Sequence, residues 1–264
     1  MTFFDAIVVA IIEGLSEFLP VSSTGHMIIA ERFLHIEQTD FVKLFTVAIQ
    51  LGAILSVIVL YYKKFFDFKK WQFYLKLIIA VVPALLLGAL FNKKIDLLLD
   101  SATTVAVALI LGGVVLLFID SFFNSATINT DEEITPKKAF AIGLWQCVAM
   151  VPGVSRSAAS IIGGMQQGLT RNMAAEFSFF LAVPTMLAAT GYKLLSYFTN
   201  HGGFTTNEIT LLLLGNVVAF VVGLIAIKFF INFVKKYGFK VWGIYRIIVG
   251  CILLLLIWQK VIAG

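Results

Sequence analysis

An otherwise apolar N-terminal segment is interrupted at residues 13–26 by the polar stretch EGLSEFLPVSSTGH, and the interpretation of the fold depends on it. Apolar residues precede the interruption from Phe3 to Ile12, and a short apolar run follows it from Met27 to Ala30. Pro20 ends a helix because proline lacks the N–H donor that a helix interior needs. Neither half is long enough to cross a hydrocarbon core of roughly 30 Å. Residues 3–33 therefore predict two short helices joined by a break.

A second interruption, PGVSRS at residues 152–157, repeats this pattern. The apolar run from Ala139 to Val151 precedes it, and an apolar, glycine-rich return follows as far as Gly168. Broken, polar backbone is tolerated at membrane depth only where protein or a water-filled cavity surrounds it. We therefore expect residues 3–33 and 139–168 to form two re-entrant helix hairpins, each returning to the side that it entered from.

The chain as a whole has the composition of a membrane protein. Of its 264 residues, 60% are hydrophobic and only 13% are charged, whereas soluble domains carry about 25% charged residues. Six continuous apolar stretches are each about long enough to span a bilayer, and their lack of alternation favours helices over barrel strands. They cover residues 41–62, 73–91, 102–120, 172–196, 208–230 and 241–259. The predicted fold is an all-α integral membrane protein with six transmembrane helices and two re-entrant hairpins.

Lysines and arginines divide the connecting loops into two groups. Most lie in the loops at 63–72, 121–138 and 231–240, and fewer lie at 31–40, 92–101 and 197–207. The positive-inside rule makes the first group cytoplasmic, so that both termini face outward. The net charge of +5 is accounted for by topology and by contact with anionic lipid. No nucleic-acid motif is present, and we expect no nucleic-acid partner.

This topology predicts an inverted repeat within a single membrane domain, residues 1–264. Its halves, residues 1–120 and 137–264, have the same order of elements and opposite orientation. Functional sites in such repeats lie near the midplane, where the repeats meet. The two hairpins would meet there, and most of the ionisable residues in apolar surroundings are in them.

The first candidate site residues are Glu13 and Glu17, which share one helix face because they are four residues apart. Two neighbouring carboxylates repel unless a divalent cation, Mg²⁺ or Ca²⁺, offsets them. One carboxyl could instead keep a proton and act as a general acid. The structural alternative is a helix that begins in the membrane interface, where both groups are solvated.

A run of hydroxyls, Ser22, Ser23 and Thr24, precedes the next helix and His26. Such residues often only cap a helix N-terminus, and a lone histidine is often structural. His26, however, follows Ser23 by three residues and can share its helix face, and a hydroxyl beside an imidazole makes a nucleophile–base pair. A helix N-terminus also binds phosphate through its free N–H groups.

The second interruption supplies Arg156, flanked by Ser155 and Ser157. A buried guanidinium needs an anion, and its planar fork matches phosphate oxygens. The alternative is a structural ion pair with Glu13 or Glu17. Glu176 is a weaker candidate, which would either orient Arg156 or be only a carboxylate at a helix end. We expect the charge of Arg246 to extend from the last span to the membrane surface.

Together these residues suit a metal-assisted phosphoryl site better than a pore. The two interruptions resemble the signature motifs of the bacterial undecaprenyl-diphosphatase family, also called the bacitracin-resistance protein family. The likeness covers nearly the whole chain, including EFSF at 176–179, AVP at 182–184 and Tyr245-Arg246. It implies a bacterial plasma-membrane enzyme that hydrolyses undecaprenyl diphosphate to undecaprenyl phosphate and recycles this carrier lipid for peptidoglycan synthesis. It also implies a divalent cation, a site open to the outside and a possible homodimer.

The resemblance assigns roles by motif position. The acidic pair falls on Glu13 and Glu17, which would hold the metal, and the catalytic set on Glu17, Ser23, His26 and Arg156. Ser22, Thr24, Ser155 and Ser157 would join Ser23 and Arg156 in binding phosphate. Ser160 stands where the motif usually has Thr. Our hypothesis is that Ser23 attacks phosphorus or positions water while His26 passes the proton. The rival is a lipid-phosphate transporter or flippase, because inverted repeats with broken helices are also typical of transporters.

Overall fold

A computed structural model describes residues 1–99, 101–123 and 126–262, with residues 92–99 described by their backbone alone. Within these residues every regular element is helical, and one isolated bridge pairs Ile128 with Leu169. The elements are α1 (Phe3–Ser16), α2 (Ser23–Phe33), α3 (Asp40–Ala48), α4 (Gln50–Leu60), α5 (Tyr62–Phe65), α6 (Trp71–Leu99), α7 (Ala102–Phe122), α8 (Pro136–Cys147), the 3₁₀ turn η1 (Val148–Met150), α9 (Arg156–Gln166), α10 (Arg171–His201), α11 (Thr206–Tyr237) and α12 (Lys240–Trp258).

The six predicted spans are confirmed as helices long and apolar enough to cross a membrane. The first consists of α3 and α4, which meet at Ile49 and together cover Asp40–Leu60. One boundary was wrong, because residues 92–99, predicted as part of a loop, continue α6 to Leu99. The apolar stretch ends there, but Lys and Leu are good helix formers, so the helix continues past the end of the apolar stretch.

Both predicted breaks are present. Residues 17–22 separate α1 from α2, and η1 with residues 151–155 separates α8 from α9. Gly153 has a φ of +90°, and a Cβ there would lie 2.5 Å from the carbonyl oxygen of Val105. Only glycine adopts this conformation freely and allows the second break to lie against α7.

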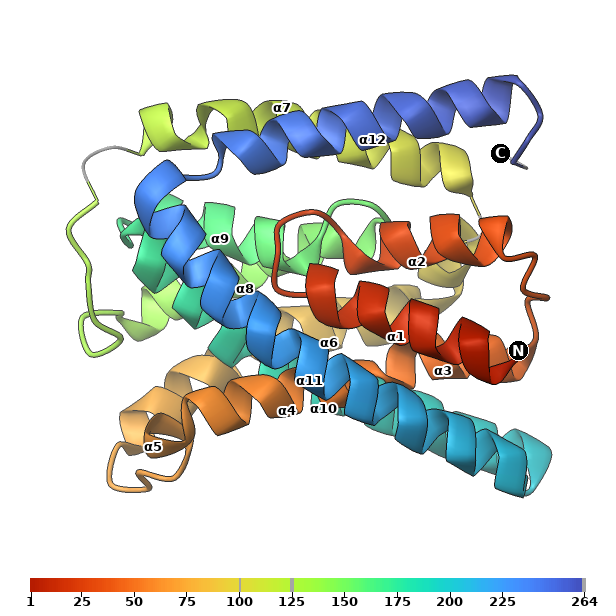
Figure 1. The fold of residues 1–264 in the computed structure, drawn as a ribbon. Coiled ribbons are helices and arrows are strands. Elements are labelled where there is room, and N and C mark those ends of the chain that lie inside the picture. The colour runs from red at the N-terminus through yellow and green to blue at the C-terminus, as the bar shows by residue number, and fades with distance from the viewer. Residues whose placement is uncertain (100, 124–125, 263–264) are drawn as a thin grey trace.

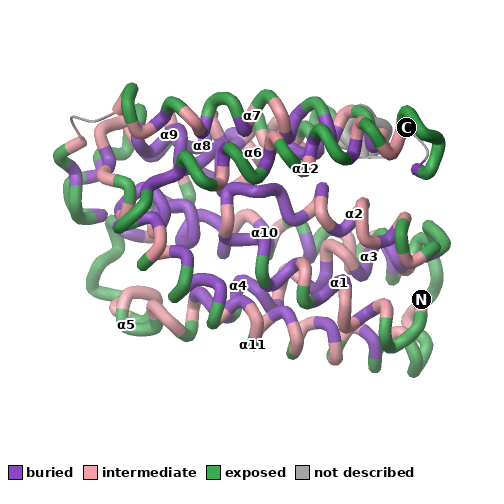
Figure 2. The backbone as a smooth tube through the Cα atoms, turned by 45° about the horizontal axis from the view of Figure 1, so that its top comes forward, coloured by how far each residue is buried: buried purple, intermediate pink, exposed green. Residues whose placement is uncertain are grey.

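Packing brings the two broken segments together inside the molecule. In Figure 1, α7 and α12 lie side by side along one edge, and α11 crosses the molecule over α1 and α4. Buried residues gather along the inward sides of the helices in Figure 2. The largest core cluster includes Phe18, which follows the first acidic pair, and Phe179, and their rings meet edge to face with centroids 5.2 Å apart. A site at the breaks is therefore surrounded by protein.

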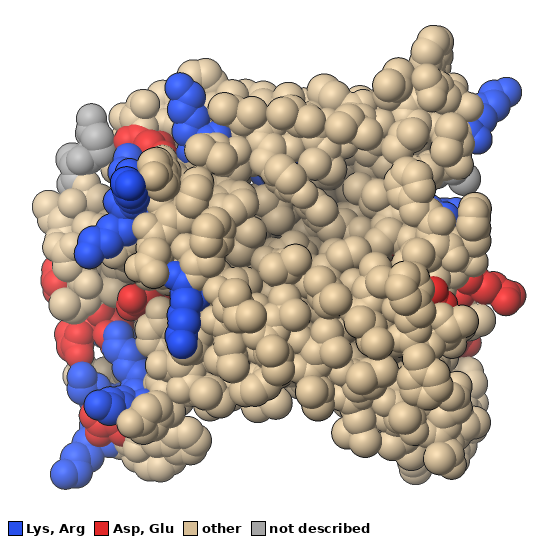
Figure 3. All heavy atoms as spheres, in the orientation of Figure 1, with Lys and Arg blue, Asp and Glu red and all other residues tan. Residues whose placement is uncertain are grey.

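Charged side chains gather at two opposite ends of the molecule, with a broad uncharged band between them (Figure 3). Both α1 and α12 have their free ends at the same end, as predicted (Figure 1). At the other end, lysines hold the link between α7 and α8. Lys76 donates to the carbonyl oxygen of Asp131 at 2.7 Å, and Lys70 pairs with Glu132 at 2.9 Å. The hydrogen bond from Lys70 lowers the pKa of the Glu132 carboxyl to about 2.

Candidate active site

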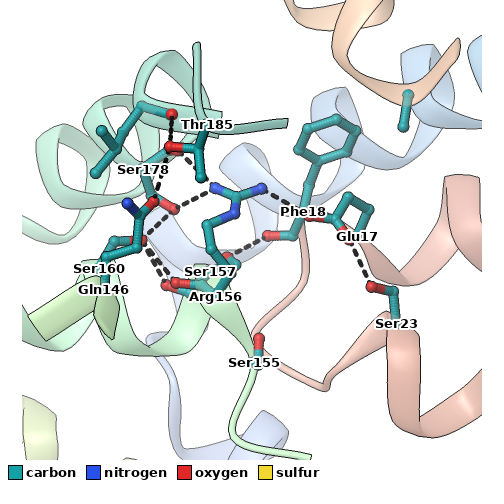
Figure 4. Close-up of polar contacts among 12 residues, drawn as sticks. Glu17, Phe18, Ser23, Gln146, Ser155, Arg156, Ser157, Ser160, Ser178 and Thr185 are labelled. Carbon is teal, nitrogen blue, oxygen red and sulfur yellow. Dashed lines mark hydrogen bonds and ion pairs between the residues drawn. The ribbon is translucent and has the colours of Figure 1, made fainter. Parts of the chain in front are cut away.

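Glu17 joins the two broken segments. It caps the C-terminus of α1 and is buried, with 5% of its surface exposed. The Ser23 hydroxyl donates to its Oε2 at 2.5 Å, and the Arg156 guanidinium pairs with its Oε1 at 2.8 Å (Figure 4). The structure therefore brings together three of the four residues predicted to be catalytic. The ion pair between Arg156 and Glu17, given as the structural alternative, is also present.

Arg156 is the first residue of α9, and its side chain points between Glu17 and Ser178 (Figure 4). Its Nη1 donates to the carbonyl oxygen of Ser178 at 2.7 Å and to the hydroxyl at 3.3 Å. Its Nε is buried and has no hydrogen-bond partner among the described residues. A buried donor without a partner is costly, so this N–H is suited to an incoming anion.

Ser178 is a site residue that the sequence analysis did not identify, although it lies in the EFSF stretch that carries the family resemblance. Its Oγ lies 2.7 Å from that of Ser160, which donates its one proton to the carbonyl oxygen of Arg156 at 2.9 Å and therefore accepts from Ser178. The hydroxyl at position 160, where the family motif usually has Thr, thus supports Arg156. On the other side, Ser157 donates to the carbonyl oxygen of Phe18 at 2.8 Å and fastens α9 to the first break.

Two serines cap the helices that begin at the breaks. Ser22 caps α2 by accepting from the N–H of Gly25 at 3.3 Å, and Ser155 caps α9 by accepting from that of Ala158 at 3.2 Å. Their φ angles are 71° and 76°, in the left-handed region that non-glycine residues rarely adopt. Such strain costs about 1–3 kcal/mol per residue and clusters at functional sites.

The two caps place two helix N-termini at the same carboxylate. Ser23 and Arg156 are the first residues of α2 and α9, and both contact Glu17. Helix N-termini favour anions through their free N–H groups and their dipoles. Thr24 is the second residue of α2 and is half-buried. The predicted hydroxyls thus lie at two helix N-termini, and Ser22 and Ser155 act there as caps.

Glu13 is fully buried one turn before Glu17, and neither of its carboxylate oxygens has a hydrogen-bond partner among the described residues. No group of three or more His, Cys, Asp or Glu side chains that could hold a metal is found in the described part of the chain. Mg²⁺ does not need such a cage, because it is commonly bound through one or two carboxylates with water and phosphate oxygens. The two glutamates fit a cation of this kind.

His26 is not paired with Ser23. Its Nδ1 lies 2.8 Å from the carbonyl oxygen of Ser22, and its Nε2 lies 2.8 Å from the hydroxyl of Tyr245 on α12. Ser23 instead donates to Glu17. The break folds Glu17 back toward the start of α2, and this brings a stronger acceptor to the hydroxyl than the imidazole. The nucleophile–base pair expected from their spacing is absent.

The expectation for Arg246 was wrong, and so was one of the two alternatives for Glu176. Arg246 does not reach the membrane surface, because it is fully buried and donates to main-chain carbonyls, including those of Pro20 and Gly153. Glu176 does not orient Arg156, and it lines a cavity with Asp120, Arg171 and Lys235. A charged residue inside an apolar run can be stabilised by carbonyl dipoles as well as by the interface, and sequence does not distinguish these outcomes.

Comparison with known proteins gives a family for this arrangement. The family model described as bacitracin resistance protein BacA matches residues 6–252. The chain is 59% identical over 256 residues to the undecaprenyl-diphosphatase of Flavobacterium psychrophilum, which covers 97% of this chain and 96% of that protein. It is 56% identical to that of Flavobacterium johnsoniae (97% and 96% covered) and 54% identical to that of Porphyromonas gingivalis (97% of each). The matched range contains every site residue described above.

Proposed function

The chain belongs to the bacitracin resistance protein BacA family, and from this premise we propose that it hydrolyses undecaprenyl diphosphate to undecaprenyl phosphate and inorganic phosphate. One observation carries the assignment to a site. Glu17 accepts both the Ser23 hydroxyl and the Arg156 guanidinium at the point where two helix N-termini meet. The proposed nucleophile Ser23 and the proposed phosphate-binding group, the Arg156 guanidinium, thus both contact Glu17, the proposed proton acceptor. Phosphoryl transfer depends on such positioning of the reacting groups.

Binding of the diphosphate would use the groups that have unsatisfied donors. The free Nε of Arg156 and the N-termini of α2 and α9 present N–H groups to the phosphate oxygens. These donors are held in a buried site, where hydrogen bonds to an anion are stronger than in water. The prenyl chain stays in the lipid between helices, because it is apolar and the outer helix faces are too.

In the chemical step, Ser23 Oγ attacks the terminal phosphorus and its proton passes to Glu17. The bond from phosphorus to the bridging oxygen breaks, and undecaprenyl phosphate leaves. Water then hydrolyses the phosphoserine and releases inorganic phosphate. In the alternative route Ser23 orients a water that attacks phosphorus directly. In both routes, the neutral His26 accepts at Nε2 the proton that Glu17 received from Ser23 or from the water, and passes it to the leaving undecaprenyl phosphate.

A divalent cation, Mg²⁺ or Ca²⁺, would be held by Glu13, whose two carboxylate oxygens have no hydrogen-bond partner among the described residues, together with Glu17 one turn later. When bound, it would offset the negative charge on the phosphate oxygens. Glu17 would have three functions in this scheme, because it would bind the metal, accept from Ser23 and hold the Arg156 guanidinium. Loss of Glu13 should therefore weaken metal dependence, and loss of Glu17 should affect all three functions.

In the membrane, α1–α2 and α8–α9 form the two re-entrant hairpins of an inverted repeat with halves 1–120 and 137–264. The packing supports this proposal. In the repeat, α8 corresponds to α1 and α11 to α6; α1 packs on α11 and, reciprocally, α8 packs on α6, while α7 packs on its counterpart α12. Lysines at the end that carries α5 make it cytoplasmic. The site then opens to the outside of the bacterial plasma membrane.

Release of inorganic phosphate by the purified protein in detergent tests the function. A prenyl diphosphate is supplied with Mg²⁺, Ca²⁺ or EDTA to wild type, Glu17→Ala and Arg156→Ala. Arg171→Ala is the matched control, because Arg171 forms a surface ion pair with Asp120 at 2.6 Å, away from the breaks.

We expect metal-dependent release by wild type and Arg171→Ala, and loss on the order of 100-fold or more in the two site variants. No release from monodisperse wild type with any metal would contradict hydrolysis. Lipid transport between vesicle leaflets would then be measured, because the rival transporter needs two compartments and no phosphate release. The names of the relatives favour the hydrolase.

A further inference from the structure

Every N–H group of the Arg246 guanidinium donates a hydrogen bond to a main-chain carbonyl oxygen. It lies on α12, outside both broken segments, and its side chain is fully buried. A guanidinium group has five N–H donors in a rigid planar fork. All five are occupied, by the carbonyl oxygens of Leu109 at 3.3 Å, Pro20 at 2.9 Å, Val154 at 2.9 Å, Ala108 at 3.0 Å and Gly153 at 2.8 Å.

The carbonyls belong to three parts of the chain, the first break, the second break and α7, whose relative positions determine the geometry of the site. Pro20 lies in the first break, and Gly153 and Val154 lie in the second. Ala108 and Leu109 belong to α7, where Gly112 leaves room for the guanidinium, because a Cβ at that residue would lie 2.3 Å from Nη2. Arg246 thus has no donor left for phosphate, unlike Arg156, and it joins the two breaks to each other.

The preceding residue, Tyr245, holds the site histidine. Its hydroxyl lies 2.8 Å from His26 Nε2, and the two rings stack with centroids 5.6 Å apart. The Ser22 carbonyl can only accept, so Nδ1 of His26 carries the proton that bonds to it. In the neutral imidazole Nε2 is then the acceptor, and the Tyr245 hydroxyl donates to it. The ring orientation and the position of its proton are fixed from two sides.

We propose that Tyr245 and Arg246 are the positioning pair of the active site, with Arg246 setting the register of the two breaks and Tyr245 orienting His26. The inference rests on the proposed hydrolysis, in which His26 carries a proton. Neither residue touches the phosphate. Both act from one turn of α12, so that a single helix sets the relation between Ser23 on one broken segment and Arg156 on the other.

Tyr245→Phe tests the pair because it removes the hydroxyl and keeps the ring. The control is Tyr192→Phe, since Tyr192 is 60% exposed on α10. Phosphate release gives kcat and KM. Protein labelled with ¹⁵N-histidine gives the ring nitrogen signals of the three histidines, and loss of a signal in His26→Gln assigns that of His26.

We expect kcat of Tyr245→Phe to fall roughly 10-fold with KM unchanged, because a poorly oriented histidine loses part of its contribution to acid–base catalysis. The Nε2 signal of His26 should move toward that of a nitrogen without a hydrogen bond, and the Nδ1 signal should stay. Wild-type kcat, or an unchanged Nε2 signal, would overturn the role of Tyr245. The ¹⁵N result does not depend on turnover, so it separates failure of this inference from failure of the hydrolase assignment.

Arg246 is tested without removing its charge. Gly112→Ala places a methyl group against Nη2, whereas Gly191→Ala meets nothing within 4 Å and serves as the control. Assayed well below its unfolding temperature, Gly112→Ala should lose about 10-fold or more in kcat, because a small misplacement of catalytic groups is expensive. Normal kcat in folded Gly112→Ala would mean that Arg246 only stabilises the fold, and the proposal for it would be withdrawn.

Discussion

At the scale of single residues, Glu17 differs from every other carboxylate in the described chain by serving two site partners at once. It accepts from Ser23 with one oxygen and from Arg156 with the other, and it is one turn from the unpartnered Glu13. Both contacts are hydrogen bonds to a carboxylate, which are shorter and stronger than hydrogen bonds between neutral groups. Two testable differences follow from this arrangement.

The first concerns the covalent route. If Ser23 is the nucleophile, rapid quenching during turnover of a prenyl diphosphate labelled with ³²P at the terminal phosphorus should leave label on the protein. Ser23→Ala should leave none, and Thr199→Ala, which loses only a hydrogen bond to the Ser196 carbonyl on the exposed end of α10, should keep it. Absence of protein-bound ³²P in the wild type at every quench time would indicate direct attack by water.

The second prediction concerns the planar guanidinium group of Arg156. Arg156→Lys keeps the charge but loses the divided contacts to Glu17 and Ser178 and the free Nε. We expect kcat/KM on the order of 100-fold below wild type, which is the usual cost of losing one preorganised donor to an anion. Turnover near that of wild type in this variant would show that a point charge is enough.

At the scale of elements, the helices that carry the breaks depend on close crossings. A Cβ at Gly143 on α8 would lie 2.2 Å from the carbonyl oxygen of Ala80 on α6, and one at Gly52 on α4 would lie 2.1 Å from that of Asn216 on α11. Small residues permit such crossings in membranes, where packing rather than water exclusion holds helices together. Asn216 adds a hydrogen bond from the Gly52 N–H at 2.7 Å.

Gly143→Ala should therefore destabilise the protein by about 1–3 kcal/mol, the usual cost of overpacking. Gly191→Ala, on α10 with open space around the added methyl, is the matched control and should be neutral or slightly stabilising. Thermal unfolding in detergent measures both. Equal midpoints for the two variants would mean that the α6–α8 crossing relaxes to admit a side chain.

At the scale of the whole molecule, the uncharged band and the two charged ends describe a multi-pass membrane protein (Figure 3). The end that carries α5 and the α7–α8 link holds most of the lysines. Anionic lipid and the insertion machinery favour that end on the cytoplasmic side.

Cysteine labelling in intact cells tests this orientation. In a background with Cys147→Ser and Cys251→Ser, a membrane-impermeant maleimide should label Gly203→Cys, at the α10–α11 link, and should spare Lys137→Cys until the cells are permeabilised. The two positions lie at opposite ends of the molecule. The reverse pattern would place the active site on the cytoplasmic side.

Local properties of the chain were enough to predict the membrane class, the six spans and both breaks, and to single out Glu17, Ser23 and Arg156 among the candidates that the fold brings together. Apolar run length and helix-breaking residues act within a few positions, and a charged group in an apolar segment stands out without a structure. Even the capping serines followed from their place before a helix.

The partners of these residues depended on the tertiary structure. The sequence offered an ion pair of Arg156 with Glu13 or Glu17 only as an alternative, and the fold selected Glu17. Arg156 and Glu17 are 139 positions apart, and Arg246 and Pro20 are 226 apart, so no local pattern relates them. Spacing paired Ser23 with His26, and the fold paired Ser23 with Glu17 and His26 with Tyr245. Most buried polar groups in a folded protein find a partner, and the folding of the two breaks against each other and against Tyr245 and Arg246 decides which partners are within reach here.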